Sequence, residues 1–264
     1  MHDKRSLRLR LADGERLLGT WVGMRSPAAI ELVAQLPFDF VVMDLQHGEL
    51  GLEDILKVAP VFRCASADPV VRTLDHSPAN IGRILDFGIE NVIVPTVNTA
   101  AAARSCVEAS AYPPFGTRSF GPFRTSQYGL REVPTTLSPD RMIGVQIETA
   151  EGVQNLDAIL ATPNLGLAFL GPYDLRISSG LPSFDALEPT VKRIADGCRQ
   201  HGIPFGTMAV TLEDAKRWLG LGLDVQFLSV GVDLNILKSG AAALASALSD
   251  FKTNRQTPSL PKNT

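Results

Sequence analysis

Short apolar segments alternate with longer segments of mixed polarity along most of the chain. The apolar segments have the continuous character of strands that are buried on both faces of a parallel sheet. We predict eight strands, over residues 19–24, 38–46, 69–73, 91–97, 142–147, 165–170, 205–209 and 225–230. The segments between and after them predict helices that begin at Ser26 and then cover 52–64, 77–88, 99–111, 150–160, 187–200, 211–219 and 234–249.

Residues at the helix boundaries support this assignment. Ser26 and Thr211 are good N-cap residues, and Pro27 suits the first position of a helix because that position needs no amide donor. Gly88 is typical of a helix end. A basic cluster near the start, Lys4, Arg5, Arg8 and Arg10, is flanked by acids and predicts a solvated first helix.

Repeated strand–helix units with short connections predict a parallel sheet. Eight units without a change in composition predict one closed (β/α)₈ TIM barrel, a fold that takes about 250 residues. We assign residues 1–252 to this catalytic domain and expect residues 253–264 to form a disordered tail. The alternative, an open doubly wound sheet, lacks its expected glycine-rich phosphate loop.

One connection is much longer than the others. Residues 112–140 are rich in proline, glycine and aromatic residues and carry no strong helix or strand pattern. Loops of this length in compact domains are usually lids or binding loops. Its part over 115–128 carries Arg118 and Arg124 and could meet an anionic substrate, including one bound in a neighbouring subunit. An ordinary surface or interface loop is an equal alternative.

Composition and charge exclude several partners. The 264 residues carry a formal net charge of -3, which argues against a nucleic-acid partner because phosphate binding requires clustered Lys and Arg. No apolar run reaches the roughly 18 residues of a membrane span. The three cysteines are widely spaced, which favours packed, reduced thiols and a cytoplasmic protein.

Polar residues cluster where the predicted strands end. Active sites of these barrels lie at the C-terminal ends of the strands, so these positions are the candidates for chemistry. They are Trp21, Asp44, Gln46, His47, Arg72, Gln146, Glu148, Asp174, Ser229 and Asp233.

Glu148 and Asp174 are the candidate metal ligands. Two carboxylates without a histidine or cysteine pair suit a hard cation such as Mg²⁺ or Mn²⁺, which keeps several waters. Arg72 could stabilise a developing oxyanion, and His47, with its ring held by Asp44, could be a general base. Structural alternatives stay open for each residue: a turn cap, an ion pair at the barrel rim, or a loop histidine.

Two other catalytic strategies lack their residues. No lysine ends a predicted strand, so a Schiff-base aldolase would have no nucleophile. The sequence also contains no G-x-S-x-G motif for an α/β-hydrolase.

At these positions the sequence resembles the HpcH/HpaI family of metal-dependent pyruvate aldolases. The similarity extends from about residue 14 to residue 250. The matching segments are 19–21, 38–47, 70–72, 91–95, 112–118, 145–149, 169–175 and 229–233, of which the most specific are Val145-Gln146-Ile147-Glu148-Thr149 and Phe169-Leu170-Gly171-Pro172-Tyr173-Asp174-Leu175.

The resemblance implies a specific reaction. A 4-hydroxy-2-oxo acid would be cleaved to an aldehyde and pyruvate through a metal-bound pyruvate enolate, with Mg²⁺, Mn²⁺ or Co²⁺ held by Glu148 and Asp174. Arg72 would stabilise the enolate oxygen, and His47 with Asp44 would transfer a proton at the aldehyde side. Implied substrate contacts are Trp21, Gln146, Gly171, Pro172, Tyr173 and Asp174. The resemblance also implies a homo-oligomer, a hexamer or trimer, with the last helix exchanged between subunits.

One departure from the family pattern concerns Gln46, where many of these aldolases carry glutamate. Glutamine can neither act as a base nor carry charge, which puts the hydrogen bonding of His47 and the acceptor aldehyde in doubt. Two other functions stay open: a thioester lyase like the citrate lyase β or malyl-CoA group, and a non-catalytic barrel that binds an oxo acid.

Overall fold

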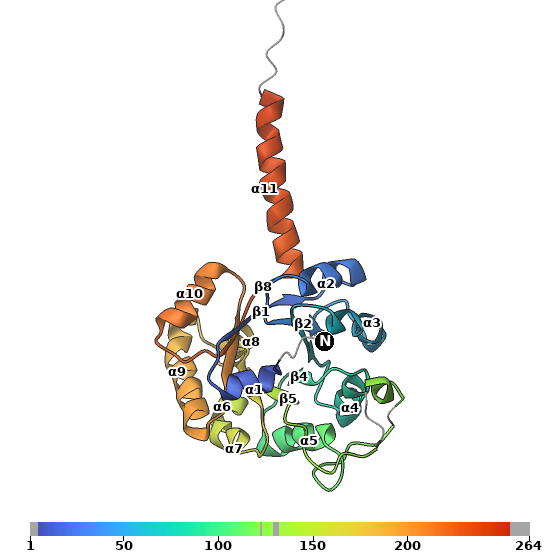
Figure 1. Ribbon diagram of the computed structural model, residues 1–264. Helices are drawn as coiled ribbons and strands as arrows, with labels where there is room; N and C mark the ends of the chain where they lie inside the picture. The colour runs from blue at the N-terminus through green and yellow to red at the C-terminus, as the bar shows by residue number, and fades with distance from the viewer. Residues whose placement is uncertain (1–4, 122, 129–131, 254–264) are drawn as a thin grey trace, which may run out of the picture.

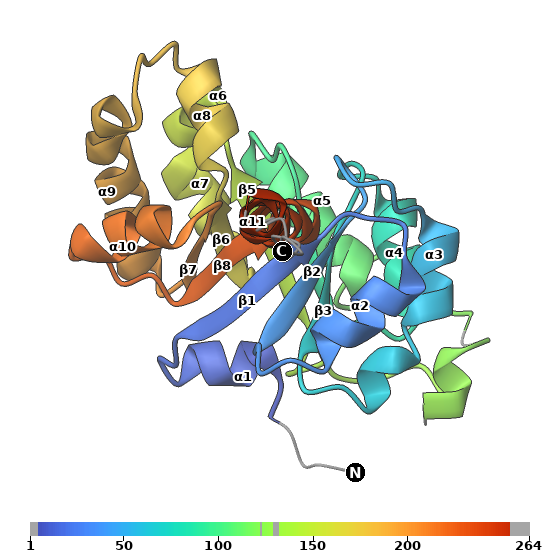
Figure 2. The ribbon, with the colours of Figure 1, turned by 90° about the horizontal axis from the view of Figure 1, so that it is seen from above.

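The computed structural model describes residues 5–121, 123–128 and 132–253. Within these ranges, eight parallel strands form one closed barrel in which each strand pairs with the next and β8 pairs with β1. Figures 1 and 2 show the strands surrounded by helices. The strands are β1 (Leu17–Val22), β2 (Phe40–Asp44), β3 (Asp68–Arg72), β4 (Asn91–Val94), β5 (Met142–Ile147), β6 (Leu167–Leu170), β7 (Phe205–Ala209) and β8 (Phe227–Val232). The predicted (β/α)₈ barrel is confirmed, with strand boundaries shifted by up to three residues.

The helices follow the predicted order. They are α1 (Leu7–Ala12), α2 (Pro27–Ala34), α3 (Leu52–Val58), α4 (Pro78–Asp86), α5 (Ala100–Ser110), α6 (Ala150–Gln154), α7 (Leu156–Leu160), α8 (Pro172–Ser178), α9 (Phe184–His201), α10 (Leu212–Gly220) and α11 (Asp233–Thr253), with 3₁₀ segments η1 (Val61–Arg63) and η2 (Thr125–Tyr128). The hydroxyls of Ser26 and Thr211 accept amide hydrogen bonds at the starts of α2 and α10, as the capping prediction requires.

Two helix predictions need correction, and one helix was not predicted. The helix expected over 52–64 ends at Val58, two residues before Pro60, which has no amide to donate within a helix. The helix expected over 150–160 is divided at Asn155 into α6 and α7. Helix α8 was not predicted because its seven residues follow a strand directly and carry too short a pattern to recognise.

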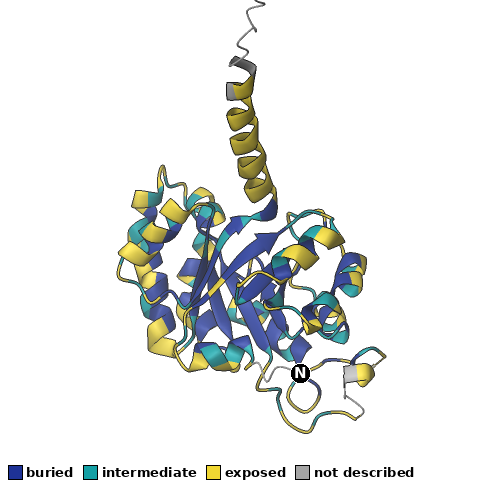
Figure 3. Cartoon of the chain, turned by 45° about the horizontal axis from the view of Figure 1, so that its top comes forward, coloured by how far each residue is buried: buried dark blue, intermediate teal, exposed yellow. Residues whose placement is uncertain are grey.

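The core has an inner and an outer part. Inside the barrel, Phe40, Phe169 and Phe227 are fully buried, and the Phe227 ring stacks on Phe40 at 3.7 Å between centroids and meets Phe169 edge-on. The outer part lies between the strands and the surrounding helices, and Figure 3 shows most of the strand residues as buried. This arrangement explains why the strands read as unbroken apolar runs.

The predicted first helix closes the N-terminal end of the barrel. Leu7 and Leu11 of α1 belong to the inner core, and α1 lies across the centre of the ring in Figure 1. Its basic residues make local contacts: Arg10 pairs with Glu15 and Asp39, and Arg8 donates to the carbonyl of Arg141. The helix is therefore a structural plug as well as a polar surface.

The long connection over 112–140 joins α5 to β5, so it lies at the end of the barrel where the strands begin. Arg141, which directly precedes β5, pairs with Glu90, which directly precedes β4. Within one chain, this connection therefore does not cover the catalytic end of its own barrel. An α-to-β connection always returns the chain to the N-terminal ends of the strands. The position of this loop is therefore set by the elements it connects, whatever its length.

Helix α11 leaves the barrel at β8 and projects away from it (Figures 1 and 2). Its apolar side chains are exposed, including Leu237, Leu244, Leu248 and Phe251. The tail predicted over 253–264 lies outside the described residues except for Thr253, which ends α11. No helix in the described ranges combines the length and apolar character that crossing a membrane requires.

Candidate active site

Glu148 is a buried carboxylate directly after β5, with 3% of its surface exposed. Its Oε1 atom accepts hydrogen bonds from the Thr96 amide, at 2.6 Å, and from the Thr96 hydroxyl, at 2.9 Å. Its Oε2 atom accepts a bond of 2.9 Å from Nε2 of Gln146. These donors hold the carboxylate in one orientation at the C-terminal end of the barrel.

Burial raises the pKa of Glu148 above its ordinary value. The two Thr96 hydrogen bonds and the positive charge of Arg72 oppose this shift, while the negative charge of Asp174 adds to it. A buried carboxylate that is destabilised as an anion and lies near a second carboxylate is suited to a cation.

Asp174 approaches this site from the first turn of α8 and is exposed. Gly171, the N-cap of α8, comes so close to Glu148 that an added Cβ would lie 2.6 Å from its Oε2 atom. The Oε1 atom of Gln146 is buried and has no hydrogen-bond partner among the described residues. Two carboxylates beside a spare amide oxygen form an all-oxygen donor set, which fits Mg²⁺ or Mn²⁺.

No cluster of three or more His, Cys, Asp or Glu side chains at metal-binding distance occurs in the described ranges. A tetrahedral zinc centre needs such a set of nitrogen or sulfur ligands. A hard cation that keeps waters and takes substrate oxygens needs only the two carboxylates.

Asp44 and Arg72 form a buried pair at the ends of β2 and β3, where the strand register places them opposite each other. Nε of Arg72 donates to Oδ1 of Asp44 at 2.8 Å, and Nη2 donates to Oδ2 at 2.5 Å. The guanidinium also lies over the ring of Trp21, 4.6 Å from its centroid. Since Nη1 makes neither of these two bonds, Arg72 is held in place and keeps donors for a further acceptor.

The family resemblance implies that Trp21 contacts the substrate. In the structure, its side chain packs in the inner core of the barrel. Its ring is 2% exposed, and its indole N–H donates to the Ser229 hydroxyl at 2.6 Å. The Asp233 carboxylate accepts from the amides of Gly23 and Met24, and so joins the end of β1 to the start of α11. Ser229 and Asp233 thus both make hydrogen bonds that connect β8 and α11 to β1 at this rim.

His47 is exposed in the loop after β2. Its main-chain amide, at 3.3 Å, and that of Gln46, at 3.0 Å, donate to Oδ1 of Asp44. Among the described residues, the ring of His47 makes no hydrogen bond to Asp44, because that carboxylate is occupied by Arg72 and by these amides. The expected Asp44–His47 ring contact is thus replaced by an Asp44–Arg72 pair. The side-chain Oε1 of Gln46 is buried without a partner in the described ranges.

Pro172 and Tyr173 begin α8, so the first amides of this helix have no acceptor within it. The Tyr173 ring packs edge-on against Phe184 at 5.0 Å, and burial raises the pKa of its hydroxyl. Its side chain therefore contacts α9, which leaves the predicted substrate contact to its main chain.

Sequence reasoning missed Thr96, which supplies two of the donors to Glu148. It lies two residues after β4 with φ at +54°, a conformation that is rare for a β-branched residue. The end of β4 could have identified it, because polar residues just after a strand were the candidates. The predicted strand ran through Val97, so Pro95 and Thr96 were read as strand residues instead of a turn.

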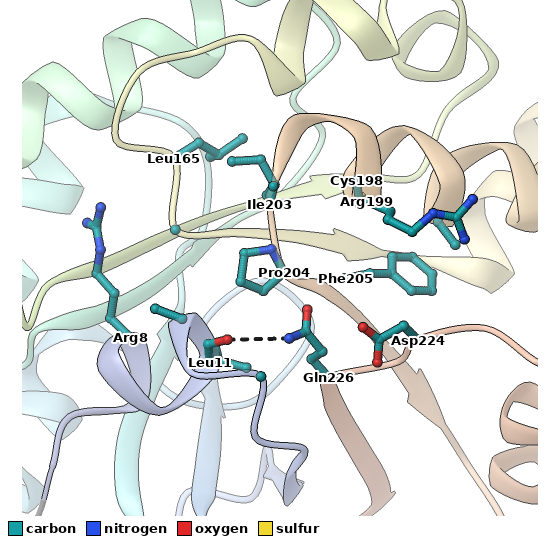
Figure 4. A pocket seen from close by; sticks show the side chains of 15 residues that line it. Arg8, Leu11, Leu165, Cys198, Arg199, Ile203, Pro204, Phe205, Asp224 and Gln226 are labelled. Atoms are coloured by element: carbon teal, nitrogen blue, oxygen red, sulfur yellow. Dashed lines mark hydrogen bonds between the residues drawn. The ribbon is translucent and has the colours of Figure 1, made fainter.

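Arg118 and Arg124 do not reach this site. Arg118 pairs with Asp86 at 2.7 Å, and Arg124 donates to the carbonyl of Leu56, so both attach the 112–140 connection to the outer helices. The hollow in Figure 4 also lies at the opposite end of the barrel, beside α1 and the starts of β7 and β8.

Comparisons with known proteins agree with this geometry. The profile of the HpcH/HpaI aldolase/citrate lyase family matches residues 17–239. The chain is 31% identical to hydroxypyruvate/pyruvate aldolase of Chromohalobacter salexigens over 240 residues, which cover 89% of this chain and 94% of that protein. It is 32% identical to 4-hydroxy-2-oxo-heptane-1,7-dioate aldolase of Escherichia coli over 247 residues, which cover 91% of this chain and 94% of the relative.

A solved structure of an HpcH/HpaI aldolase/citrate lyase family protein from Burkholderia cenocepacia superimposes with a TM-score of 0.84. It shares 26% identity, and the match covers 94% of this chain and all of the other. The predicted resemblance and the predicted class, an aldolase lyase, are confirmed. The family profile spans every strand of the barrel, and this chain belongs to the HpcH/HpaI aldolase/citrate lyase family.

Proposed function

We propose that this chain is a divalent-metal-dependent aldolase that cleaves a 4-hydroxy-2-oxo acid to pyruvate and an aldehyde. The substrate would be a 2-keto-3-deoxy sugar acid or a hydroxy-oxo-dioate. The observation that carries the proposal is the buried Glu148 carboxylate, oriented by Thr96 and Gln146 within the fields of Asp174 and Arg72. The similarity to a hydroxypyruvate/pyruvate aldolase and to a 4-hydroxy-2-oxo-heptane-1,7-dioate aldolase supports the same reaction.

Glu148 and Asp174 would hold the cation. Mg²⁺ and Mn²⁺ are the first candidates, and Co²⁺ is the third. Bound there, it supplies a Lewis acid for the 2-oxo group and a site for the substrate's carboxylate. The first amides of α8 would donate hydrogen bonds to the oxo acid, and the buried Oε1 atom of Gln146 would accept one from a hydroxyl of the substrate. Gly171 keeps this side of the site open, since a larger residue would collide with Glu148.

The reaction breaks the bond between C3 and C4 of the substrate. The 4-hydroxyl loses its proton and becomes the aldehyde, while the bonding electrons move to C3 and leave the enolate of pyruvate. Arg72, fixed by Asp44 and Trp21, would stabilise the negative charge that develops on the enolate oxygen. His47 would accept the proton of the 4-hydroxyl, and protonation at C3 would complete the formation of pyruvate.

Asp44 therefore has a different proposed role from the one its position in the sequence suggested. It would hold the guanidinium of Arg72 and, through main-chain amides, the loop that carries His47. We also propose a cytoplasmic homo-oligomer, a trimer or hexamer, in which a neighbouring subunit covers the exposed apolar side chains of α11.

The decisive experiment measures pyruvate release with a lactate dehydrogenase coupling assay. A panel of 4-hydroxy-2-oxo acids would be tested with Mg²⁺, Mn²⁺ or Co²⁺ and after chelation. We expect metal-dependent release that is lost in Glu148→Ala and kept in Glu151→Ala, a matched control that removes an exposed carboxylate from α6. Cleavage of acyl-CoA substrates without pyruvate release would instead favour the thioester lyases, and metal-dependent ligand binding without turnover would favour a binding protein.

Arg72→Ala separates metal binding from catalysis. We expect turnover to fall by about 10²- to 10³-fold, the usual loss when an oxyanion-stabilising donor is removed, while Mn²⁺ binding, followed by electron paramagnetic resonance, stays within a few-fold of the wild type. Full turnover in this variant would contradict the role given to Arg72.

A further inference from the structure

The two proposed metal ligands are held very differently. Glu148 is buried and accepts three hydrogen bonds from Thr96 and Gln146. The Asp174 carboxylate is exposed on α8 and makes no hydrogen bond or ion pair with the part of the chain that the structure describes. Because seven residues are too few for a stable helix without tertiary contacts, the position of Asp174 depends on what holds α8.

Contacts with the barrel hold both ends of α8 and its inner face. Gly171, the N-cap, lies against Glu148, and Leu175 is fully buried in the outer core. At the other end of the helix, the Ser178 hydroxyl accepts a hydrogen bond of 3.0 Å from the Ala150 amide at the start of α6. These contacts fix α8 against β5 and α6.

One aromatic ring holds α8 from the side of α9. Phe184, the first residue of α9, meets the Tyr173 ring edge-on, with 5.0 Å between centroids and 85° between planes. The guanidinium carbon of Arg176 lies 5.5 Å from the centroid of the same Phe184 ring. Both contacts are attractive, since aromatic rings prefer edge-on pairs and the face of a ring attracts a cation. Tyr173 and Arg176 share one face of α8, and Asp174 lies between them in the chain.

Phe184 is itself fixed to the barrel through α10. Its ring packs edge-on against Trp218, with 6.3 Å between centroids, and Trp218 is 3% exposed. The Trp218 indole N–H donates to the carbonyl of Met208 in β7 at 3.1 Å. A continuous series of contacts therefore runs from β7 to the two residues that flank Asp174 on α8.

The connection between α8 and α9 is also held in place. Nη1 of Arg176 donates to the Leu181 carbonyl at 3.3 Å, and the Leu181 amide donates to the Arg176 carbonyl at 3.0 Å. The Ser183 hydroxyl accepts from the Ala186 amide and caps α9 directly before Phe184. Because this connection is bonded at both of its ends, the Phe184 ring has a set place relative to α8.

We propose that Phe184 is a positioning residue for the metal site, whose ring holds α8 so that the Asp174 carboxylate stays within reach of a cation at Glu148. This inference deepens the proposed function and rests on its metal site. Without the ring, α8 keeps its contacts with β5 and α6 but gains freedom on the side of α9. Asp174 then spends less time in the binding position, so metal affinity falls while the fold persists.

The test measures Mn²⁺ binding to the full-length protein by electron paramagnetic resonance, and the urea midpoint without metal in parallel. Phe184→Leu removes the ring and keeps an apolar side chain, whereas Phe184→Tyr keeps the ring. Phe38→Leu is the matched control, because Phe38 is also a partly buried phenylalanine packed against the outer core, and it precedes β2 at the opposite end of the barrel. Tyr173→Leu removes the same ring pair from the α8 side and gives an independent answer if Phe184→Leu fails to fold.

We expect the Kd for Mn²⁺ to rise about five- to tenfold in Phe184→Leu, as the loss of an aromatic pair and a cation–π contact allows. Tyr173→Leu should show a smaller rise, and Phe184→Tyr and Phe38→Leu should keep the wild-type Kd. The urea midpoint should fall in both Phe184→Leu and Phe38→Leu, so a loss of stability alone does not change the Kd.

An unchanged Kd in Phe184→Leu, an equal rise in Phe38→Leu, or no recovery in Phe184→Tyr would each overturn the proposal. A wild type that binds Mn²⁺ without releasing pyruvate would refute the aldolase reaction, and the expected pattern of Kd values would still support the role of Phe184. A wild type that binds no Mn²⁺ would refute the metal site and this inference with it.

Discussion

Thr96 shows how a single residue determines the state of the proposed metal site. It adopts a backbone conformation that costs a β-branched residue on the order of 1–3 kcal/mol, and it directs both its amide and its hydroxyl at one oxygen of Glu148. These bonds oppose the rise in the pKa of Glu148 that burial causes. The strained residue thus favours the charged form, which a cation needs.

Replacing Thr96 by valine should therefore weaken metal binding. The variant keeps the amide bond and the side-chain shape but loses the hydroxyl bond to the carboxylate. Since hydrogen bonds to charged groups contribute about 1.5–3 kcal/mol, we expect the Kd for Mn²⁺ to rise about tenfold or more in a calorimetric titration. Thr20→Val is the matched control, because within the described part of the chain the buried Thr20 hydroxyl bonds only to the Gly231 carbonyl. Equal affinity in both variants would argue against this function of Thr96.

The cysteines allow a second prediction at this scale. Burial raises the pKa of Cys106 and of Cys198 to about 12, whereas Cys64 is exposed. Because the thiolate is the reactive form, one of the three thiols should react with Ellman's reagent at pH 8 in the native state, and all three after unfolding in denaturant. Rapid native labelling of two or three thiols would contradict the buried positions.

The same shifts predict how stability depends on pH. In the native state, Cys106 and Cys198 keep protons that the unfolded chain releases near the ordinary thiol pKa of 9.0. Because the native state binds more protons, the free energy of unfolding should fall as the pH rises above about 9 and toward 12. Urea denaturation at pH 8 and at pH 10 measures this decrease, which should be smaller in a Cys106→Ala, Cys198→Ala double variant.

At the scale of elements, the close approach of α8 to β5 assembles the site. Gly171 ends the turn after β6 and begins α8, in contact with both Glu148 and Gln146. That contact brings Asp174, in the first turn of α8, into the electrostatic field of Glu148. Under the proposed function, this short helix placed directly after a strand would thus take part in the chemistry, although its sequence pattern is weak.

Gly171→Ala should separate these two elements. The new Cβ would lie 2.6 Å from Glu148 Oε2 and 2.7 Å from its Cβ, so either α8 or the carboxylate must move. We expect at least a tenfold loss of kcat/KM and of metal affinity. Gly82→Ala, inside α4, meets no atom within 4 Å and should keep full activity with a stability gain of about 0.5–1 kcal/mol. Normal kinetics in Gly171→Ala would show that the contact is not required.

At the scale of the whole molecule, α11 extends beyond its own barrel, which leaves the apolar side chains of this helix exposed. Leu237, Leu244 and Phe251 repeat every seven residues with Leu248 between them, and all four are exposed. A seam of this spacing is typical of helices that pack against another helix. The proposed exchange of α11 between subunits gives this seam a partner.

Removing residues 238–264 should therefore reduce the assembly to smaller species, which light scattering coupled to size-exclusion chromatography would detect. The matched control removes only residues 254–264 and leaves α11 intact. An unchanged mass after the longer deletion would show that α11 does not hold subunits together.

The sequence by itself determined the strand order, the helix order and the catalytic end of the barrel. Buried parallel strands leave continuous apolar runs, and the chemistry of this fold lies where those runs end. Glu148, Arg72 and Asp44 were therefore found at strand ends and Asp174 just beyond one, in the first turn of α8, and the family motifs indicated the reaction. Only local information was needed for these predictions.

Only the tertiary structure decided which of these groups meet. The register of β2 against β3 pairs Asp44 with Arg72 and leaves the His47 ring without that carboxylate. The turn after β4 brings Thr96, 52 positions before Glu148, into contact with it, and chain topology places the 112–140 connection at the opposite end of the barrel. Side-chain pairing depends on distances between segments remote in the chain, and a local pattern of polar and apolar residues contains no information about those distances.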